Sequence, residues 1–146
     1  MCDRMVRVMA SGVFDIIHTG HISYLQQAKA LGDELIVVVA CDKTVRKSKH
    51  EPITPERMRV QIVNSLKPVD KAVLGKDGDI FDIVRELSPD IIALGFDQTF
   101  KESDLREGLE KHGLGHIKVS RASEYAEDLA ATRRIIKKIR QLEDTS

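Results

Sequence analysis

Two histidines stand three residues apart in the run GVFDIIHTGH, residues 12–21. The run follows an apolar stretch and precedes a helix-like pattern, so His18 and His21 fall at the start of the predicted helix. Unpaired backbone N–H groups and the positive end of the helix dipole make such a start an anion site. Two imidazoles can donate hydrogen bonds to a phosphate there, Gly20 lets the backbone approach it, and Gly12 is expected to make the tight turn. We therefore interpret the run as a phosphate-binding loop, against the alternative that His18 packs and His21 caps the helix.

A basic run, KTVRKSKHEPITPER at residues 43–57, is the second candidate for phosphate chemistry. Its cations before the first acid are Lys43, Arg46, Lys47 and Lys49. A run of this kind is either solvated surface or a grip on phosphate, and both interpretations stay open here. Arg57, in the first turn of the next predicted helix, opposes the helix dipole, so a bound anion would give it a reason to be there.

Two further polar loops follow apolar runs. In GFDQTF, residues 95–100, Gly95 permits the close approach of a base or ribose, and Asp97 and Gln98 can hydrogen-bond to it. The other loop begins at Arg121 and leads into the last predicted helix.

The loops must be positioned by an alternation of strands and helices. We predict strands at residues 5–10, 34–41, 71–75, 90–95 and 116–120, and helices at residues 21–32, 54–66, 79–88, 103–113 and 127–143. Such alternation implies right-handed crossovers and one parallel sheet covered on both faces. The predicted fold is α/β, a single doubly wound five-stranded parallel sheet spanning residues 1–146 as one domain. Ligands bind such sheets beyond the carboxyl ends of the strands, where every polar loop lies.

Local signals refine these bounds. Gly32 and Gly113 stand where helices often end, and Thr54-Pro55 is typical of an N-cap followed by the first helical residue. In the last predicted helix the spacing of Ile135, Ile136, Ile139 and Leu142 predicts a packed apolar stripe.

Composition excludes several classes of protein. The chain has 146 residues with 32% charged residues and a formal net charge of zero, which argues against a general nucleic-acid or membrane-surface binder. The longest apolar run, residues 35–41, is too short to cross a bilayer, and no signal peptide is evident. Two cysteines are too few for a disulfide framework, and Cys41 is expected to be buried. We expect a cytoplasmic protein without a metal cage, a P-loop or a G-x-G-x-x-G motif.

The run GVFDIIHTGH resembles the His-x-Gly-His signature of the nucleotidyltransferase superfamily, whose members include cytidylyltransferases and adenylyltransferases. The resemblance extends to about residue 139, and together with AKALGDELIVVVACD, PERMRVQIVNSLKPVD and PDIIALGFDQ it looks most like the archaeal FAD synthases. It implies a Rossmann-like nucleotidyltransferase fold and transfer of AMP from ATP to FMN. It also implies a divalent cation, Mg²⁺ or similar, bound with ATP, and a homodimer, with no nucleic acid or membrane as partner.

By this resemblance, His18 and His21 hold the triphosphate and stabilise charge in the transition state. Asp15 has either a site role or a role in stabilising the turn. The implied nucleotide-binding residues are Val13, Phe14, His18, Thr19, Gly20, His21, Lys47, Lys49, Arg57, Asp97, Gln98, Arg121, Tyr125 and Thr132.

Two alternatives remain at this point. One is a cytidylyl- or adenylyltransferase that acts on glycerol 3-phosphate or a sugar phosphate, and the other is a regulatory nucleotide-binding module without catalysis. Ala130 and Ala131 replace the Ile-Ser of the Arg-Thr-x-Gly-Ile-Ser-Thr-Thr run of cytidylyltransferases, which favours ATP. Phe96, Phe100 and Tyr125 could form an apolar wall for an isoalloxazine ring.

Overall fold

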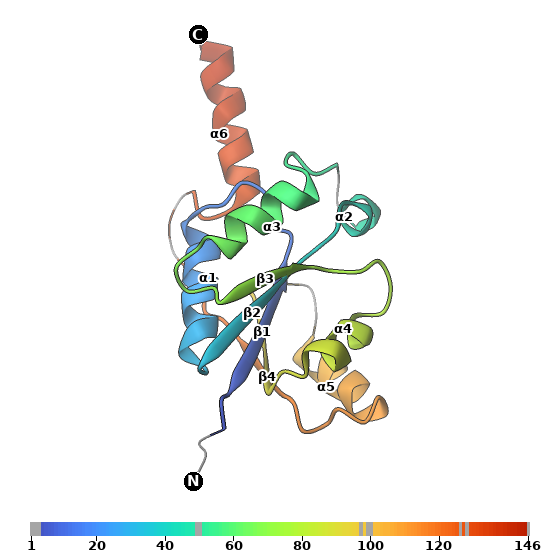
Figure 1. Ribbon diagram of the computed structural model, residues 1–146. Helices are drawn as coiled ribbons and strands as arrows, with labels where there is room; N and C mark the ends of the chain where they lie inside the picture. Colours follow the sequence, from blue (N-terminus) through green and yellow to red (C-terminus); the bar gives the residue numbers. More distant parts are fainter. Residues whose placement is uncertain are drawn as a thin grey trace.

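A computed structural model describes residues 4–48, 51–96, 98, 101–125, 127 and 129–145. Five parallel strands form one sheet in the order β3-β2-β1-β4-β5. The strands are β1 (Arg7–Gly12), β2 (Glu34–Val39), β3 (Lys71–Leu74), β4 (Ile91–Leu94) and β5 (Lys118–Arg121). The helices are α1 (Thr19–Ala30), α2 (Asp42–Ser48), α3 (Glu56–Asn64), α4 (Ile80–Leu87), α5 (Glu102–Lys111) and α6 (Thr132–Thr145). The predicted doubly wound α/β fold is confirmed, and the strand order reverses between β1 and β4 (Figure 1).

The sheet is buried on both faces because helices cover each of them. On one face Val8 and other strand residues pack with Leu25 of α1 and Val63 of α3. On the opposite face Met9 packs with Val84 of α4 and with residues of α5. Neighbouring strand residues point to opposite faces, so a strand covered on both sides must be apolar throughout, as the buried residues of β1 and β2 are. This arrangement leaves the carboxyl ends of the strands as the edge where polar loops gather.

The basic run contains a helix that the sequence did not predict, α2 at Asp42–Ser48. A helix of seven residues is too short to show a clear apolar period. Its first backbone N–H, on Asp42, is donated to the carboxylate of Glu56 at 3.0 Å. A residue from the next helix therefore caps α2, and no local capping signal marks its start.

The predicted N-cap of α3, Thr54, is wrong by one residue. The helix begins at Glu56, its N-cap is Pro55, and Pro55 makes no side-chain cap. The hydroxyl of Thr54 is used elsewhere, because it donates to a carboxylate oxygen of Asp15 at 2.6 Å.

The two glycines predicted at helix ends follow α1 and α5 for different reasons. Gly113 has a φ of +73°, which a left-handed helix end requires. Gly32 follows the C-cap Leu31 of α1, and a Cβ atom there would lie 2.7 Å from the carbonyl oxygen of Val6. The close approach of the chain before β1, and not a left-handed turn, therefore requires the glycine.

Helix α6 begins at Thr132, five residues later than predicted, and none of its residues is buried. Its predicted apolar stripe does not pack on the sheet: Ile139 and Leu142 are 55% and 60% exposed. The reason is visible in Figure 1, where α6 projects from the body with the C-terminus at its far end. Only the first turns of α6 reach the carboxyl edge of the sheet. Among the helices described, none is both long enough and apolar enough to span a membrane.

Candidate functional site

A cavity of about 440 Å³ lies at the carboxyl ends of β1, β4 and β5, between the starts of α1 and α6. This is the switch point of the sheet, where ligands of doubly wound folds bind. Its predicted residues are Val13, Phe14, His18, Gly20, His21, Gln98, Tyr125 and Thr132, and it is also lined by Phe96, Arg133 and Arg134. A second hollow, of about 390 Å³ between α5 and β5, lies away from the histidines.

The two imidazoles form a stacked pair at the first turn of α1. Their ring centroids are 3.8 Å apart and their planes differ by 25°. His18 is the N-cap: its Nδ1 accepts from the N–H of Gly20 at 3.1 Å, while its own N–H donates to Nδ1 of His21 at 3.2 Å. Because each Nδ1 accepts a backbone hydrogen bond, the neutral rings carry their protons on Nε2. The pair therefore presents two Nε2–H donors, as a phosphate site requires.

His18 both caps the helix and lines the cavity, so the two interpretations of the histidine run are not exclusive. Gly20 is required by packing as well. A Cβ atom at this position would lie 2.7 Å from the carbonyl oxygen of Ala130 and 2.9 Å from Cε1 of His18. A larger residue would displace the His18 ring or the segment before α6.

The turn after β1 is not made by Gly12, so that prediction is wrong. Gly12 is the last residue of β1, and a Cβ atom there would lie 3.0 Å from the ring of Phe14. The left-handed residues are Phe14 and Ile16, with φ of +56° and +54°. Non-glycine residues rarely adopt this conformation, so contacts from the surrounding structure must hold them in it.

Burial of the Phe14 side chain is one such contact. Its ring is 3% exposed and lies 5.4 Å from the ring of His21, centroid to centroid. It also stacks on Tyr24 at 6.4 Å, and the hydroxyl of Tyr24 donates to the carbonyl of Ala93 in β4 at 2.5 Å. The aromatic pair thus links the imidazoles to the sheet.

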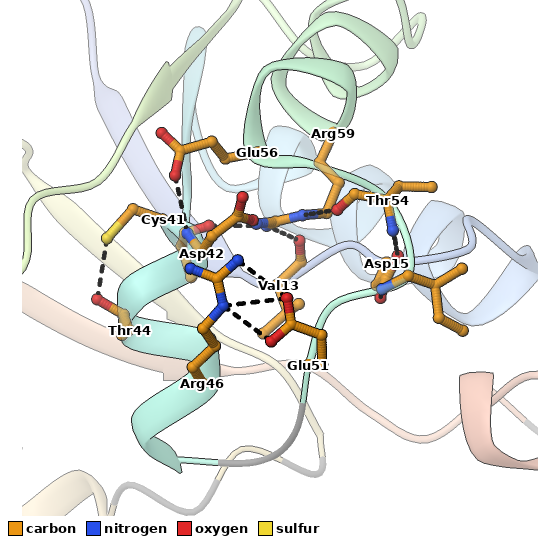
Figure 2. A network of polar contacts seen from close by, with 12 residues as sticks. Val13, Asp15, Cys41, Asp42, Thr44, Arg46, Glu51, Thr54, Glu56 and Arg59 are labelled. Carbon is orange, nitrogen blue, oxygen red and sulfur yellow. Dashed lines mark hydrogen bonds and ion pairs between the residues drawn. The ribbon is translucent and has the colours of Figure 1, made fainter.

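Arg59, which sequence reasoning missed, is the buried cation behind the site (Figure 2). Its guanidinium donates to the backbone carbonyls of Val13 at 2.8 Å, Ala40 at 2.7 Å and Thr54 at 3.0 Å. It also pairs with Asp42 at 2.6 Å. One side chain therefore joins the loop after β1, the end of β2 and the segment before α3. The available signal was its spacing, since Arg59 lies one helical turn before the buried Val63, on the apolar face of α3.

Asp15, whose role the sequence left open, is 5% exposed and bonded through its carboxylate. Burial alone would raise its pKa, but the hydrogen bonds from Thr54 and Ile53, with the nearby charge of Arg59, hold the pKa below its ordinary value of 3.8. The bonds come from the N–H of Ile53 at 2.7 Å, the N–H of Thr54 at 3.0 Å and the Thr54 hydroxyl at 2.6 Å. Asp15 is therefore ionised and fixed at neutral pH.

Three cations of the basic run pair with acids in this structure. Lys47 and Lys43 contact the carboxylate of Asp77 at 3.0 and 3.2 Å, and Arg46 contacts Glu51 at 2.9 Å. Arg57 is exposed on α3, and neither it nor Lys47 is among the described residues that line the cavity. Lys49 lies outside the described residues. Their binding to a triphosphate stays a prediction.

Predicted residues on the β4 and β5 side divide between the cavity wall and its support. Gln98 lines the cavity and latches its loop, accepting from the N–H of Gly95 at 2.8 Å and donating to the carbonyl of Ser11 at 2.7 Å. Arg121 lies behind the same loop, where it donates to the carbonyl of Gly95 at 2.9 Å and pairs with Glu102 at 3.0 Å. Asp97 and Phe100 lie outside the described residues.

The last predicted residues meet at the start of α6. The hydroxyl of Thr132 donates to the backbone carbonyl of Asp15 at 2.8 Å, which fixes α6 against the loop after β1. The hydroxyl of Thr19 donates to Glu127 at 2.9 Å, so it holds the segment before α6 and does not line the cavity. Arg133 and Arg134, which the sequence reasoning did not single out, follow Thr132 into the cavity wall.

These groups can bind and neutralise a polyphosphate. The cavity combines two imidazole donors, the starts of two helices and two arginines, all of which favour anions. In the ranges that the structure describes, no three side chains of His, Cys, Asp or Glu are grouped as metal ligands. The donors and positive charges of the cavity thus favour phosphate chemistry.

Replacing Arg59 tests its structural role. We expect Arg59→Met to lower the free energy of unfolding by about 3–5 kcal/mol, because Asp42 and three carbonyls lose their buried partner. Arg57→Met, two residues earlier on the exposed side of the same helix, is the matched control and should change it by less than about 0.5 kcal/mol. Urea unfolding at pH 7 measures both, and equal values for the two variants would contradict the assignment.

The lowered pKa of Asp15 predicts a pH-dependent contribution to stability. The ionised carboxylate stabilises the fold fully above its ordinary pKa of 3.8, and this contribution is lost as pH falls through its lower folded value. Asp15→Asn should therefore cost about 1–3 kcal/mol at pH 7. The difference from the wild type should shrink below about pH 4. Unfolding curves from pH 7 to below pH 4 measure this difference, and the exposed Asp104→Asn is the control. A difference in the free energy of unfolding between the wild type and Asp15→Asn that does not change with pH would refute the prediction.

Comparison with known proteins agrees with this geometry. The family model described as Cytidylyltransferase-like matches residues 9–142. A curated FAD synthase of Archaeoglobus profundus is 54% identical over 136 residues, covering 90% of this chain and 87% of that protein. The FAD synthase of Thermoplasma acidophilum is 51% identical over 138 residues, covering 94% and 96%.

A solved structure is similar over most of the chain. The crystal structure described as the lipopolysaccharide core biosynthesis protein from Thermoplasma volcanium is 50% identical, with a TM-score of 0.82, and covers 84% of this chain and all of that chain. The resemblance seen in the sequence is therefore confirmed, and the chain belongs to the cytidylyltransferase-like family of nucleotidyltransferases.

Proposed function

We propose that this chain is an FAD synthase that transfers AMP from ATP to FMN and releases pyrophosphate. The observation that carries the reaction type is the stacked pair of His18 and His21 in a cavity at the switch point of the sheet. The choice of ATP and FMN rests on the curated relatives named FAD synthase, at 46–54% identity over most of the chain. The five strands form one sheet, which supports treating residues 1–146 as one nucleotidyltransferase domain.

In the proposed reaction an oxygen of the FMN phosphate attacks the α-phosphorus of ATP. The new P–O bond forms as the bond to the bridging oxygen of the β-phosphate breaks, and pyrophosphate leaves with that electron pair. The protein supplies position and charge compensation, because phosphoryl transfer needs little covalent help. The Nε2–H groups of His18 and His21 donate to the phosphoryl oxygens, on which negative charge grows in the transition state.

The remaining cavity residues can compensate phosphate charge or stack on a planar ring of the substrates. Arg133 and Arg134, at the start of α6, line the same cavity and add positive charge for the phosphates. Phe96 and Tyr125 line the same cavity and are 51% and 45% exposed. Exposed aromatic rings at a cavity mouth suit stacking on a planar ring, either adenine or isoalloxazine. We assign nucleotide contacts to this wall together with Val13, Gln98 and Thr132.

A divalent cation bound with ATP fits this site. Of the two described acidic residues that line the cavity, Asp15 is already engaged by Ile53 and Thr54, and Glu124 is exposed. The ion, Mg²⁺ or similar, would therefore be held by phosphate and water, and it would neutralise phosphate charge.

A sugar phosphate is the alternative to FMN as the acceptor. The Thermoplasma volcanium structure carries a description from lipopolysaccharide synthesis, which favours a sugar phosphate acceptor. The homodimer and the cytoplasmic location expected from the sequence stay predictions, and light scattering of the purified protein measures the first directly.

A substrate panel tests donor and acceptor together. The protein with ATP, FMN and Mg²⁺ should form FAD and pyrophosphate, whereas CTP with glycerol 3-phosphate and ATP with heptose 1-phosphate should give little product. Chromatography of the nucleotide products reads out all three mixtures. CDP-glycerol or ADP-heptose in place of FAD would change the acceptor and leave nucleotidyl transfer standing, and nucleotide binding without any product would favour the regulatory module.

Removing either imidazole should act mainly on turnover. His18→Asn keeps an oxygen that can cap α1 and accept from Gly20, but it removes the Nε2–H donor. We expect it, and His21→Ala, to lower kcat by about 10² or more, the scale of one lost oxyanion-type donor, with a smaller change in ATP affinity. The exposed His116→Ala is the control. Near-normal turnover in either site variant would contradict the catalytic role.

A further inference from the structure

We propose that Asp15 is a positioning residue of the reaction: it holds the Ile53–Thr54 segment of the basic run, and the start of α6, at a fixed distance from His18 and His21. The inference rests on the proposed function. Asp15 would then neither contact the substrate nor act on its own turn alone. It would connect separate segments of the site, and we call this connection a tether.

The carboxylate of Asp15 is used entirely within the protein. Oδ2 accepts from the N–H of Ile53 at 2.7 Å, and Oδ1 accepts from the N–H and the hydroxyl of Thr54 at 3.0 and 2.6 Å. The residue is 5% exposed, so these donors replace water around the charge. An acceptor group saturated in this way is suited to fixing a neighbouring segment and poorly suited to binding a substrate.

The backbone of Asp15 holds a third element. Its carbonyl accepts from the hydroxyl of Thr132 at 2.8 Å, at the first residue of α6. The left-handed residues Phe14 and Ile16 flank it, so the peptide is turned to face both partners. Asp15 also lies three residues before His18 in the chain. Any shift of Asp15 is therefore passed to the imidazole loop, to the Ile53–Thr54 segment and to α6.

The stretch from Asp42 to Thr54, which carries the lysines of the basic run, is anchored at both ends (Figure 2). At its start, Asp42 is held by Arg59 and by Glu56, and at its end Thr54 is held by Asp15 and by Arg59. The intervening cations, among them Lys47, can approach a triphosphate only as far as these anchors permit. Transfer of a nucleotidyl group needs the imidazoles and the cations in place together, and a misplacement of 1 Å can cost about 10² in rate.

A matched pair of substitutions tests the tether. Thr54→Val keeps the shape of the side chain but removes the hydroxyl donor to Oδ1, whereas Thr54→Ser retains it. We expect Thr54→Val to lower kcat for FAD formation about tenfold and to weaken ATP binding several-fold, with the KM for FMN unchanged. Thr54→Ser should stay within about twofold of the wild type. Asp15→Asn, which removes the charge and leaves one acceptor oxygen where the carboxylate had two, should lower kcat about 10².

A double variant separates a tether from general destabilisation. Asp15→Asn combined with Thr54→Val should lower kcat by less than the product of the two single losses, because both substitutions act on the same contact. All variants are assayed at 25 °C after circular dichroism and thermal unfolding show that they are folded. Folded Thr54→Val and Asp15→Asn with wild-type kcat and wild-type ATP affinity would overturn the proposal, as would additive losses in the double variant.

Two measurements keep this result apart from the proposed function. The wild-type yield of FAD tests the function, while the ratio of variant to wild type tests the tether. Calorimetric titration with ATP in the absence of acceptor gives that ratio even if the acceptor is another phosphate. A wild type that binds ATP but forms no FAD, together with weakened binding in Thr54→Val and normal binding in Thr54→Ser, would reject FMN and support the tether.

Discussion

The site depends on a guanidinium buried beneath it. Burying a charge is costly unless it is paired and its donors are satisfied. Arg59, which is 0% exposed, meets that condition through Asp42 and the carbonyls of Val13, Ala40 and Thr54. These carbonyls belong to three segments that share no ladder of the sheet. The position of the cation is therefore defined only when the ends of β1 and β2 and the segment before α3 have come together.

Side-chain bonds to the backbone govern the edge of the sheet where the cavity lies. The ladder between β1 and β2 ends at Gly12 and Val39, and side-chain contacts hold much of the chain beyond it. Arg59, Asp15, Thr132 and Gln98 each contact the backbone of a segment remote in the sequence. Such contacts can hold Phe14 and Ile16 in left-handed conformations that a plain turn would not maintain.

Local patterns in the sequence predicted the sheet, its layers and the histidine loop, because apolar runs and helix starts are written within a few neighbouring residues. They failed where a remote partner decides the structure. Helix α2 is capped by Glu56 of the next helix. The hydroxyl of Thr54 donates to Asp15 and does not cap α3. Helix α6 begins later than predicted, at Thr132, whose hydroxyl donates to the carbonyl of Asp15. The apolar spacing of α6 predicted packing, but the helix continues past the sheet that would have covered it.

The identity of the residue at the start of α1 follows from these constraints. Ser, Asp or Asn would cap a helix well, yet Ser and Asp carry no N–H donor, and the amide N–H of Asn lies one bond nearer the backbone than Nε2 of an imidazole. Imidazole has two nitrogens on opposite sides of one rigid ring. In His18 the first accepts from Gly20 and the second carries the proton of the neutral ring, and the N–H of His18 sets the same tautomer in His21. The helix start therefore selects the protonation pattern that the chemistry needs, and the fold and the reaction share the same hydrogen bonds.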